Sequence, residues 1–177
     1  MKTKNTPNAS QSNENQIMSA MEKILKKHRR FCSIRMVKKA DRTFVAATFG
    51  IADDVESNPL LFGCQQIDGM PTALQLDCNI TSGLESLNCA DLCNDITREM
   101  CFGKVFIVGK AEALRYGASH LFVGPSPNEQ VVHVLVDEAL NAQVSTCVTV
   151  ARLRRLAKTQ VQAGTLFASV TPRFDLN

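Results

Sequence analysis

The chain has 177 residues, 45% of them hydrophobic, and a formal net charge of +3. This length suits one domain of ordinary size plus a tail, and two unrelated full domains would be cramped in it. No apolar run approaches the roughly 18 to 20 residues of a membrane helix, and the polar first residues lack the apolar core of a secretion signal. We therefore expect a cytoplasmic protein, with the nucleus as the alternative, and no membrane partner.

Charge is divided unevenly along the chain. Residues 1–42 hold eleven Lys and Arg against three acids (11 − 3 = +8), residues 43–150 four against thirteen (4 − 13 = −9), and residues 151–177 five against one (5 − 1 = +4). Basic ends around an acidic middle favour contact with a polyanion such as RNA through the ends. Ordinary solvated lysines explain the N-terminal charge equally well.

The N-terminal region divides into a tail and a helix. Residues 1–15 are polar and rich in Asn and Ser, which predicts a disordered tail. From residue 16 the apolar residues fall at helical spacing, which predicts an amphipathic helix with one apolar face: Ile17, Met18, Met21, Ile24 and Leu25. The basic cluster that closes it is a candidate phosphate-binding site, formed by Lys26, Lys27, Arg29 and Arg30. Cations also favour the negative end of a helix, which is the competing explanation.

The middle of the chain has a mixed pattern. Residues 31–37 and 44–51 fit either a strand or a helix, and residues 60–64 predict a short buried strand. Residues 84–100 predict an irregular helix. The chain has seven cysteines but no C-x-x-C pair, so we expect reduced, partly buried thiols and no metal site.

The best-defined part is residues 100–177. An apolar run at 105–108, a helix-forming stretch at 111–116 and a second apolar run at 121–123 are separated by glycines, which predicts strand, helix and strand. Asn128 is a good N-cap for a helix to about residue 142. The remaining segments are predicted as a strand at 144–150, a basic helix at 151–160 and a last strand opening at Gly164. Such alternation predicts βαβ crossovers in a single α/β domain over residues 16–177, with the sheet covered on both faces.

Part of this region resembles a known family. The segments Cys101-Phe102-Gly103 and Gly117-Ala118, together with residues 164–174, resemble the C-terminal domain of eukaryotic and archaeal release factors and of pelota. That domain is a three-layer α/β/α sandwich with a mixed sheet, shared with the kink-turn-binding ribosomal proteins, whose Gly-x-x-Glu signature is matched by Gly109 and Glu112. The resemblance covers about residues 90–177. It implies an RNA-associated, ribosome-associated binding module in translation or RNA metabolism.

No catalytic residue or cofactor is expected. The hydrolytic Gly-Gly-Gln of release factors is absent from the chain, so no residue can inherit that role. Gly109-Lys110 follows an apolar run as a phosphate loop does, but Ala111 stands where that loop requires Ser or Thr. His120 and His133 have no companion in a nucleophile motif. We therefore predict a protein that is not an enzyme.

RNA contact is expected at the start of the helix predicted after Gly109. Lys110, Glu112 and Arg115 would contribute to this site, supported by the N-terminal basic cluster. A plain helix start, with Gly109 in the turn and Glu112 near the positive pole, explains the same pattern.

The alternative function is a protein-interaction adaptor. The segments Ala73-Leu74-Gln75 and His120-Leu121-Phe122-Val123 are similar to segments of the growth-arrest and DNA-damage-inducible family, which acts by binding partner proteins. Such an adaptor of stress or cell-cycle signalling would use the acidic residues within 53–99.

Overall fold

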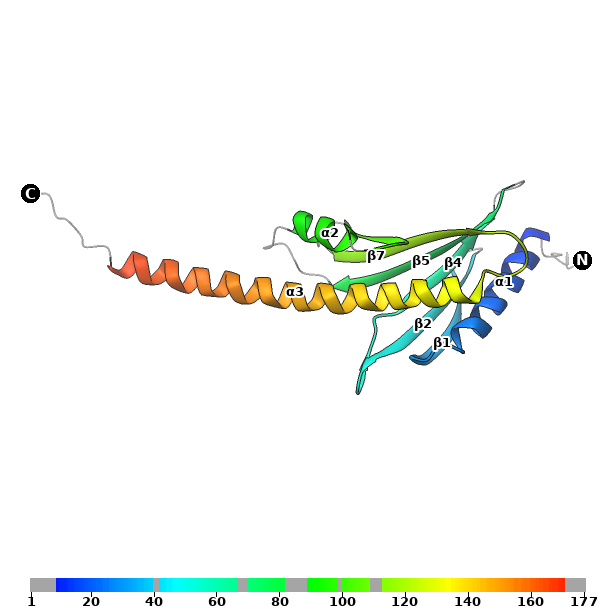
Figure 1. The fold of residues 1–177 in the computed structure, drawn as a ribbon, viewed down its shortest axis with the longest axis horizontal. Helices are drawn as coiled ribbons and strands as arrows, with labels where there is room; N and C mark the ends of the chain where they lie inside the picture. The colour runs from blue at the N-terminus through cyan, green and yellow to red at the C-terminus, as the bar shows by residue number, and fades with distance from the viewer. Residues whose placement is uncertain are drawn as a thin grey trace, which may run out of the picture.

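The fold is built on one antiparallel sheet with helices packed against it (Figure 1). The computed structural model describes residues 9–39, 42–66, 70–81, 89–98, 100–108 and 113–170, without the side chains of 9–12, 89–92, 153 and 156–170. The elements in chain order are α1 (Ala9–Leu25), β1 (Phe31–Lys39), β2 (Arg42–Ala52), β3 (Val55–Glu56), β4 (Leu60–Gln65), β5 (Thr72–Thr81), α2 (Cys89–Arg98), β6 (Gly103–Val108), β7 (Ala113–Phe122) and α3 (Glu129–Val170).

The predicted three-layer α/β/α sandwich with a mixed sheet is wrong. The sheet has seven strands in the order β1-β2-β4-β5-β7-β6, with β3 paired to β2 beside that path, and every described strand pair is antiparallel. Antiparallel neighbours need only short connections, so the helical crossovers on which the expected sandwich depended are not required. The described helices α1 and α3 pack on the same core, against one face of the sheet.

Strand alternation separates the two faces of the sheet. In β5 the side chains of Leu74, Leu76, Cys78 and Ile80 are buried, and the residues between them are more exposed. The inward residues of β5 pack on α3, and the five apolar residues expected on one face of α1 are all buried in the same core. The predicted amphipathic helix is therefore confirmed, although α1 begins at Ala9, within the segment predicted as a disordered tail. Burial of a helix stripe against alternate strand residues is what holds such a two-layer structure together.

The segment predicted as strand, helix and strand is a pair of antiparallel strands. Ala113 begins β7, so the helix expected over residues 111–116 is wrong, while residues 109–112 lie outside the described part of the chain. Leu114 and Tyr116 are fully buried and Arg115 between them is not. This period of two is the signature of a half-buried strand, and it outweighs the helix propensity of the same residues.

Helix α3 is 42 residues long and includes two segments predicted as strands. Its start is as expected, because the Asn128 side chain accepts hydrogen bonds from the amides of Gln130 (2.9 Å) and Val131 (3.3 Å). The strands predicted at residues 144–150 and from Gly164 are wrong, since the helix continues to Val170. Thr146 and Val150 are buried against the core, and this packing offsets the low helix propensity of β-branched residues. The C-terminal part of the helix projects past the sheet (Figure 1).

The two edge strands are protected in different ways. Helix α2 lies beside β6, where the Thr97 hydroxyl accepts a hydrogen bond from the Val105 amide (3.1 Å) and donates one to the Val105 carbonyl (3.3 Å). Strand β1 carries Arg35, Lys38 and Lys39, and charge discourages pairing with another chain's edge.

Candidate nucleic-acid interface

The sheet face turned away from α1 and α3, here called the open face, is basic. Alternation and strand register place five cationic side chains on it and two acids among the described residues, a balance of 5 − 2 = +3. The cations are Arg35, Lys39, Arg42, Lys104 and Arg115, and the acids are Glu56 and Asp77. A face with this balance attracts polyanions.

Two phenylalanine rings lie on the open face, each packed against a glycine. A Cβ added at Gly63 would lie 2.9 Å from a ring carbon of Phe44, and one added at Gly117 would lie 2.9 Å from a ring carbon of Phe106. Aromatic rings that cover strand glycines also stabilise sheets, so part of their role is structural. Both rings remain partly exposed and offer a surface for stacking.

A cation stands beside each ring. The Arg42 guanidinium is 5.3 Å from the centre of the Phe44 ring, and the Lys104 ammonium is 6.0 Å from that of Phe106. In both cases the cation precedes the phenylalanine by two residues on one strand, so the two side chains share a face. The Arg42 side chain is further fixed by a hydrogen bond to the Cys64 carbonyl (2.9 Å).

The open face has a hollow of about 530 Å³ over β5, β7 and β6. Gly117 and Ala118 belong to its floor, and its polar lining includes Gln75, Asp77, Lys104 and Ser119. Phe106 contributes an aromatic wall. A flat ring bordered by amide, hydroxyl and charged groups suits a planar, hydrogen-bonding ligand such as a nucleobase.

Arg115 lies on the open face, on β7 rather than on the helix expected for it. Its guanidinium makes a two-point contact with the Asp77 carboxylate across the β5–β7 pair, with 3.1 Å between Nε and Oδ1. This pairing fixes the guanidinium plane and neutralises part of its charge. The other residues predicted for this site, Gly109, Lys110 and Glu112, lie outside the described residues.

The predicted N-terminal basic cluster follows α1, beside the first turns of α3. Lys26 pairs with Glu22 (2.8 Å), Lys27 with Glu129 (2.7 Å), and Arg29 lies 3.6 Å from Asp137. Arg30 immediately precedes β1, and its carbonyl accepts a hydrogen bond from the Gly50 amide (2.7 Å). Three of the four cations thus face carboxylates, which lowers the local positive potential.

His28 is buried beside this cluster. Its Nδ1 accepts a hydrogen bond from the Arg30 amide (3.1 Å), which leaves the proton of the neutral ring on Nε2, 3.4 Å from Asp137 Oδ1. The contact with Asp137 is electrostatic rather than a well-aligned hydrogen bond, because that oxygen has no hydrogen-bond partner among the described groups. Burial lowers the pKa of His28 and outweighs the attraction of Asp137, with His133 adding to the lowering.

We expect acidification to destabilise the fold through His28. Its pKa is lowered from 6.5 in the folded chain, so the unfolded chain takes up the proton first as the pH falls. The free energy of unfolding should therefore decrease as the pH drops from about 6.5 toward the folded pKa. Urea unfolding at about pH 7.5 and about pH 5.5 measures this decrease, which should be smaller in the variant His28→Asn. A pH dependence identical in the two proteins would show that His28 does not cause the loss of stability.

The acidic residues considered for protein binding lie on separate elements. Asp53 and Asp54 form the turn between β2 and β3, Asp77 pairs with Arg115, and Asp95 lies on α2 near Arg98. Figure 1 shows α2 and the β2–β3 turn on opposite sides of the molecule. The described acids of residues 53–99 therefore do not form one patch.

Several residues of the open face were missed by sequence reasoning: Arg35, Lys39, Arg42, Phe44, Lys104 and Phe106. A usable signal exists in the repeated spacing of Arg42-x-Phe44 and Lys104-x-Phe106. It becomes informative only when both segments are known to be strands, since a spacing of two shares a face in a strand and not in a helix.

Comparison with known proteins adds no relative, since no protein-family model, curated protein or solved structure matches this chain.

Within the described residues, no group of three His, Cys, Asp or Glu side chains is placed to hold a metal ion. Burial raises the pKa of the Cys64 and Cys78 thiols to about 11, which keeps them protonated and unreactive. None of the described helices is long and apolar enough to span a membrane.

Proposed function

We propose that this protein binds single-stranded RNA on the open face of its sheet, as a non-catalytic module in translation or RNA metabolism. The supporting observation is the pair of cation-flanked rings, Arg42 with Phe44 and Lys104 with Phe106. Proteins that bind single strands combine a basic track for the phosphates with aromatic rings on which bases stack. The open face carries both features.

The arrangement suits a strand that crosses the sheet. From β1 to β6 there are six strands in the main path, which span about 24 Å at the usual spacing of neighbouring strands. Phe44 lies on β2 toward one edge and Phe106 on β6 at the other, with the Arg115–Asp77 pair on the intervening strands. Bases must leave their own stack to lie on such rings, which favours a single strand over a duplex.

The N-terminal basic cluster is the weaker site within this proposal. Lys26 and Lys27 already pair with carboxylates, so a phosphate would have to displace Glu22 and Glu129. On the open face, Arg35 and Lys39 are exposed on the edge strand β1, where a phosphate can approach directly.

Binding of a labelled single-stranded oligoribonucleotide, measured by fluorescence anisotropy over a salt series, tests the proposal. With four phosphate contacts, from Arg35, Lys39, Arg42 and Lys104, log K should fall with log[salt] with a slope of about −3. The variant Arg35→Ala/Lys39→Ala should reduce the slope magnitude by about 1.4. Phe106→Leu keeps an apolar side chain but removes the flat ring, and it should weaken binding about tenfold.

The matched control is Lys26→Ala/Lys27→Ala, which removes the same charge beside α3. We expect it to leave the slope nearly unchanged, with thermal unfolding of every variant showing that the fold is kept. Binding lost in this control and preserved in the open-face variants would move the site to the basic cluster. Absence of measurable binding at low salt in the unsubstituted protein would refute RNA binding itself.

A further inference from the structure

The acidic residues of helix α3 lie in its first half and the basic residues in its second half. Residues 129–150 contain Glu129, Asp137 and Glu138 and no Lys or Arg, whereas residues 151–170 contain four Lys and Arg and no acid. The helix dipole does not account for this, because its influence is confined to the first and last turns. Asp137 and Glu138 lie beyond the first turn, and the basic residues lie twelve or more positions before the end at Val170.

The half that packs on the sheet has a stripe of mostly exposed residues, in which Glu138 is half-buried. Val134, Glu138, Asn141, Ser145 and Val148 are separated by alternating steps of four and three residues, so they share one side of the helix. Val134 is 47% exposed and Val148 is 65% exposed. The same steps continue to Arg152 and Arg155, which are also exposed. One side of α3 therefore runs from an acidic to a basic end.

A groove borders the acidic end of this stripe. It has a volume of about 510 Å³ and lies between α2 and α3, with Val134, Glu138, Asn141 and Ser145 on one side and Ile96 and Met100 on the other. The Glu138 carboxylate is held at the groove by the amides of Phe102 and Gly103 (3.1 to 3.2 Å). The groove thus combines apolar walls with a fixed negative charge.

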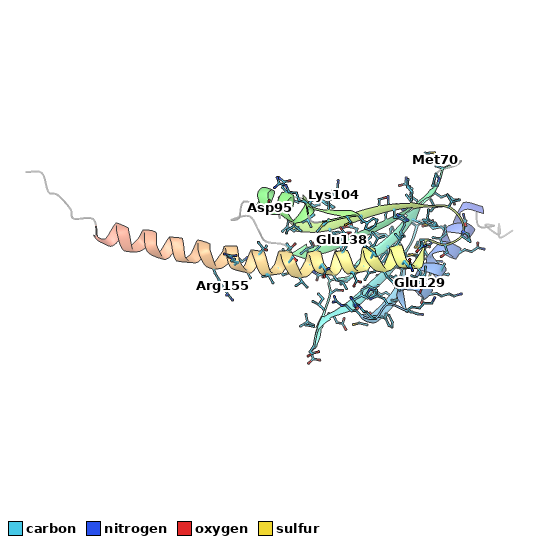
Figure 2. The ribbon with its side chains drawn as sticks, in the orientation of Figure 1. Met70, Asp95, Lys104, Glu129, Glu138 and Arg155 are labelled. Carbon is cyan, nitrogen blue, oxygen red and sulfur yellow. The ribbon has the colours of Figure 1, made fainter. Side chains whose placement is uncertain are left out.

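The other half of α3 extends away from the sheet (Figures 1 and 2). Arg155 is labelled in Figure 2 on this projecting part, and Glu138 is labelled over the sheet. A helix gains most of its stability from packing of an apolar face rather than from the propensity of its residues. A partner that covers this half would supply packing of this kind.

We propose that the partner is a second copy of this chain, with the two α3 helices packed antiparallel about a two-fold axis near residues 146 and 147. This register places Glu138 opposite Arg155, Asn141 opposite Arg152 and Ser145 opposite Val148. Each contact occurs twice in a two-fold pair. The paired region from 138 to 155 is about 27 Å long, and the basic half of each helix lies along the groove of the other copy.

Sedimentation of the nuclease-treated full chain tests the proposal. A dimer is expected, and the variant Arg152→Glu/Arg155→Glu should weaken it by about tenfold or more, because both Glu138–Arg155 contacts of the pair become repulsive and both Asn141–Arg152 contacts lose their cation. The control Arg154→Glu/Lys158→Glu makes the same charge change on another side of the helix and should have a much smaller effect. Circular dichroism checks that both variants keep their helix content.

A single substitution separates the antiparallel from the parallel arrangement. Asn141→Glu adds an acid opposite Arg152 of the other copy and should tighten the antiparallel dimer about threefold, with binding that weakens in salt. In a parallel pair the new carboxylates would face each other and loosen it. A monomer at about 100 µM, equal effects of the two double variants, or a looser dimer for Asn141→Glu would each overturn the proposal. A monomer that sediments with anionic phospholipid vesicles would assign the basic half to a membrane surface instead.

Discussion

Replacing Phe62 with alanine is expected to lower the free energy of unfolding by about 3 to 5 kcal/mol. Phe62 lies on β4 near the middle of the sheet, and its side chain is fully buried in the core shared with α1. Removing the ring leaves a cavity that strands fixed on both sides cannot close, because β4 is paired with β2 and with β5. Urea unfolding followed by circular dichroism measures the loss.

Phe44→Ala is the matched control, since it deletes the same side chain from the opposite face of the sheet. Phe44 lies on the neighbouring strand β2, over Gly63 on the open face, and we expect a loss of about 1 kcal/mol. A loss as large as that of Phe62→Ala would mean that this face is also covered, which is the arrangement of a three-layer sandwich. The pair of variants therefore tests the architecture as well as a side chain.

The parts of the fold that could be predicted are those in which a local pattern agrees with the packing. The apolar stripe of α1 has a helical period over several turns, and only one face of that helix is buried. The start of α3 was predicted from Asn128, whose capping bonds involve only the next three residues. The strand at residues 60–64 was expected from a short apolar run and lies within β4.

The wrong elements are those in which packing overrides a local preference. The sequence V-S-T-C-V-T-V at 144–150 has the composition of a strand, yet it is helical because Thr146 and Val150 fit against the core. The stretch from Ala113 has helix-forming residues, yet it pairs with β5 over nearly its whole length. Local sequence does not show that the first segment packs on the core or that the second pairs with β5. The errors in these two segments produced the wrong fold class.

The candidate site could not be predicted because it depends on which face of the sheet stays uncovered. The basic cluster at 26–30 was visible as a run of charges, but its pairing with Glu129 and Asp137 joins residues about one hundred positions apart. Arg42 and Lys104 are isolated in the sequence, and the sheet brings them onto one face. Clustering of charge along a chain was a poor guide to clustering in space.

Replacing Gly103 with alanine is expected to lower the free energy of unfolding by about 2 to 3 kcal/mol. Gly103 opens β6, and an added methyl group would meet the ring and hydroxyl of Tyr116, too close for either to stay in place. Tyr116 is fully buried, and this burial raises the pKa of its hydroxyl well above the usual value, with the charges of nearby Glu138 and Cys78 adding to the rise. A ring held in the core cannot move aside, so the strand must shift, and the hydrogen bond from the Gly103 amide to Glu138 (3.2 Å) is disturbed with it. Thermal or urea unfolding measures the change.

Gly117→Ala tests whether confinement of the neighbouring ring is the cause of the loss. Its added methyl group also meets an aromatic ring, that of Phe106, but this ring lies on the open face and can turn toward solvent. We therefore expect a loss below about 1 kcal/mol, together with weaker RNA binding because the turned ring leaves its place over residue 117. Equal destabilisation by the two substitutions would show that Phe106 is as confined as Tyr116, and a ring so confined would not be available to stack on a base. The stability of Gly117→Ala thus bears on the proposed function as directly as a binding measurement.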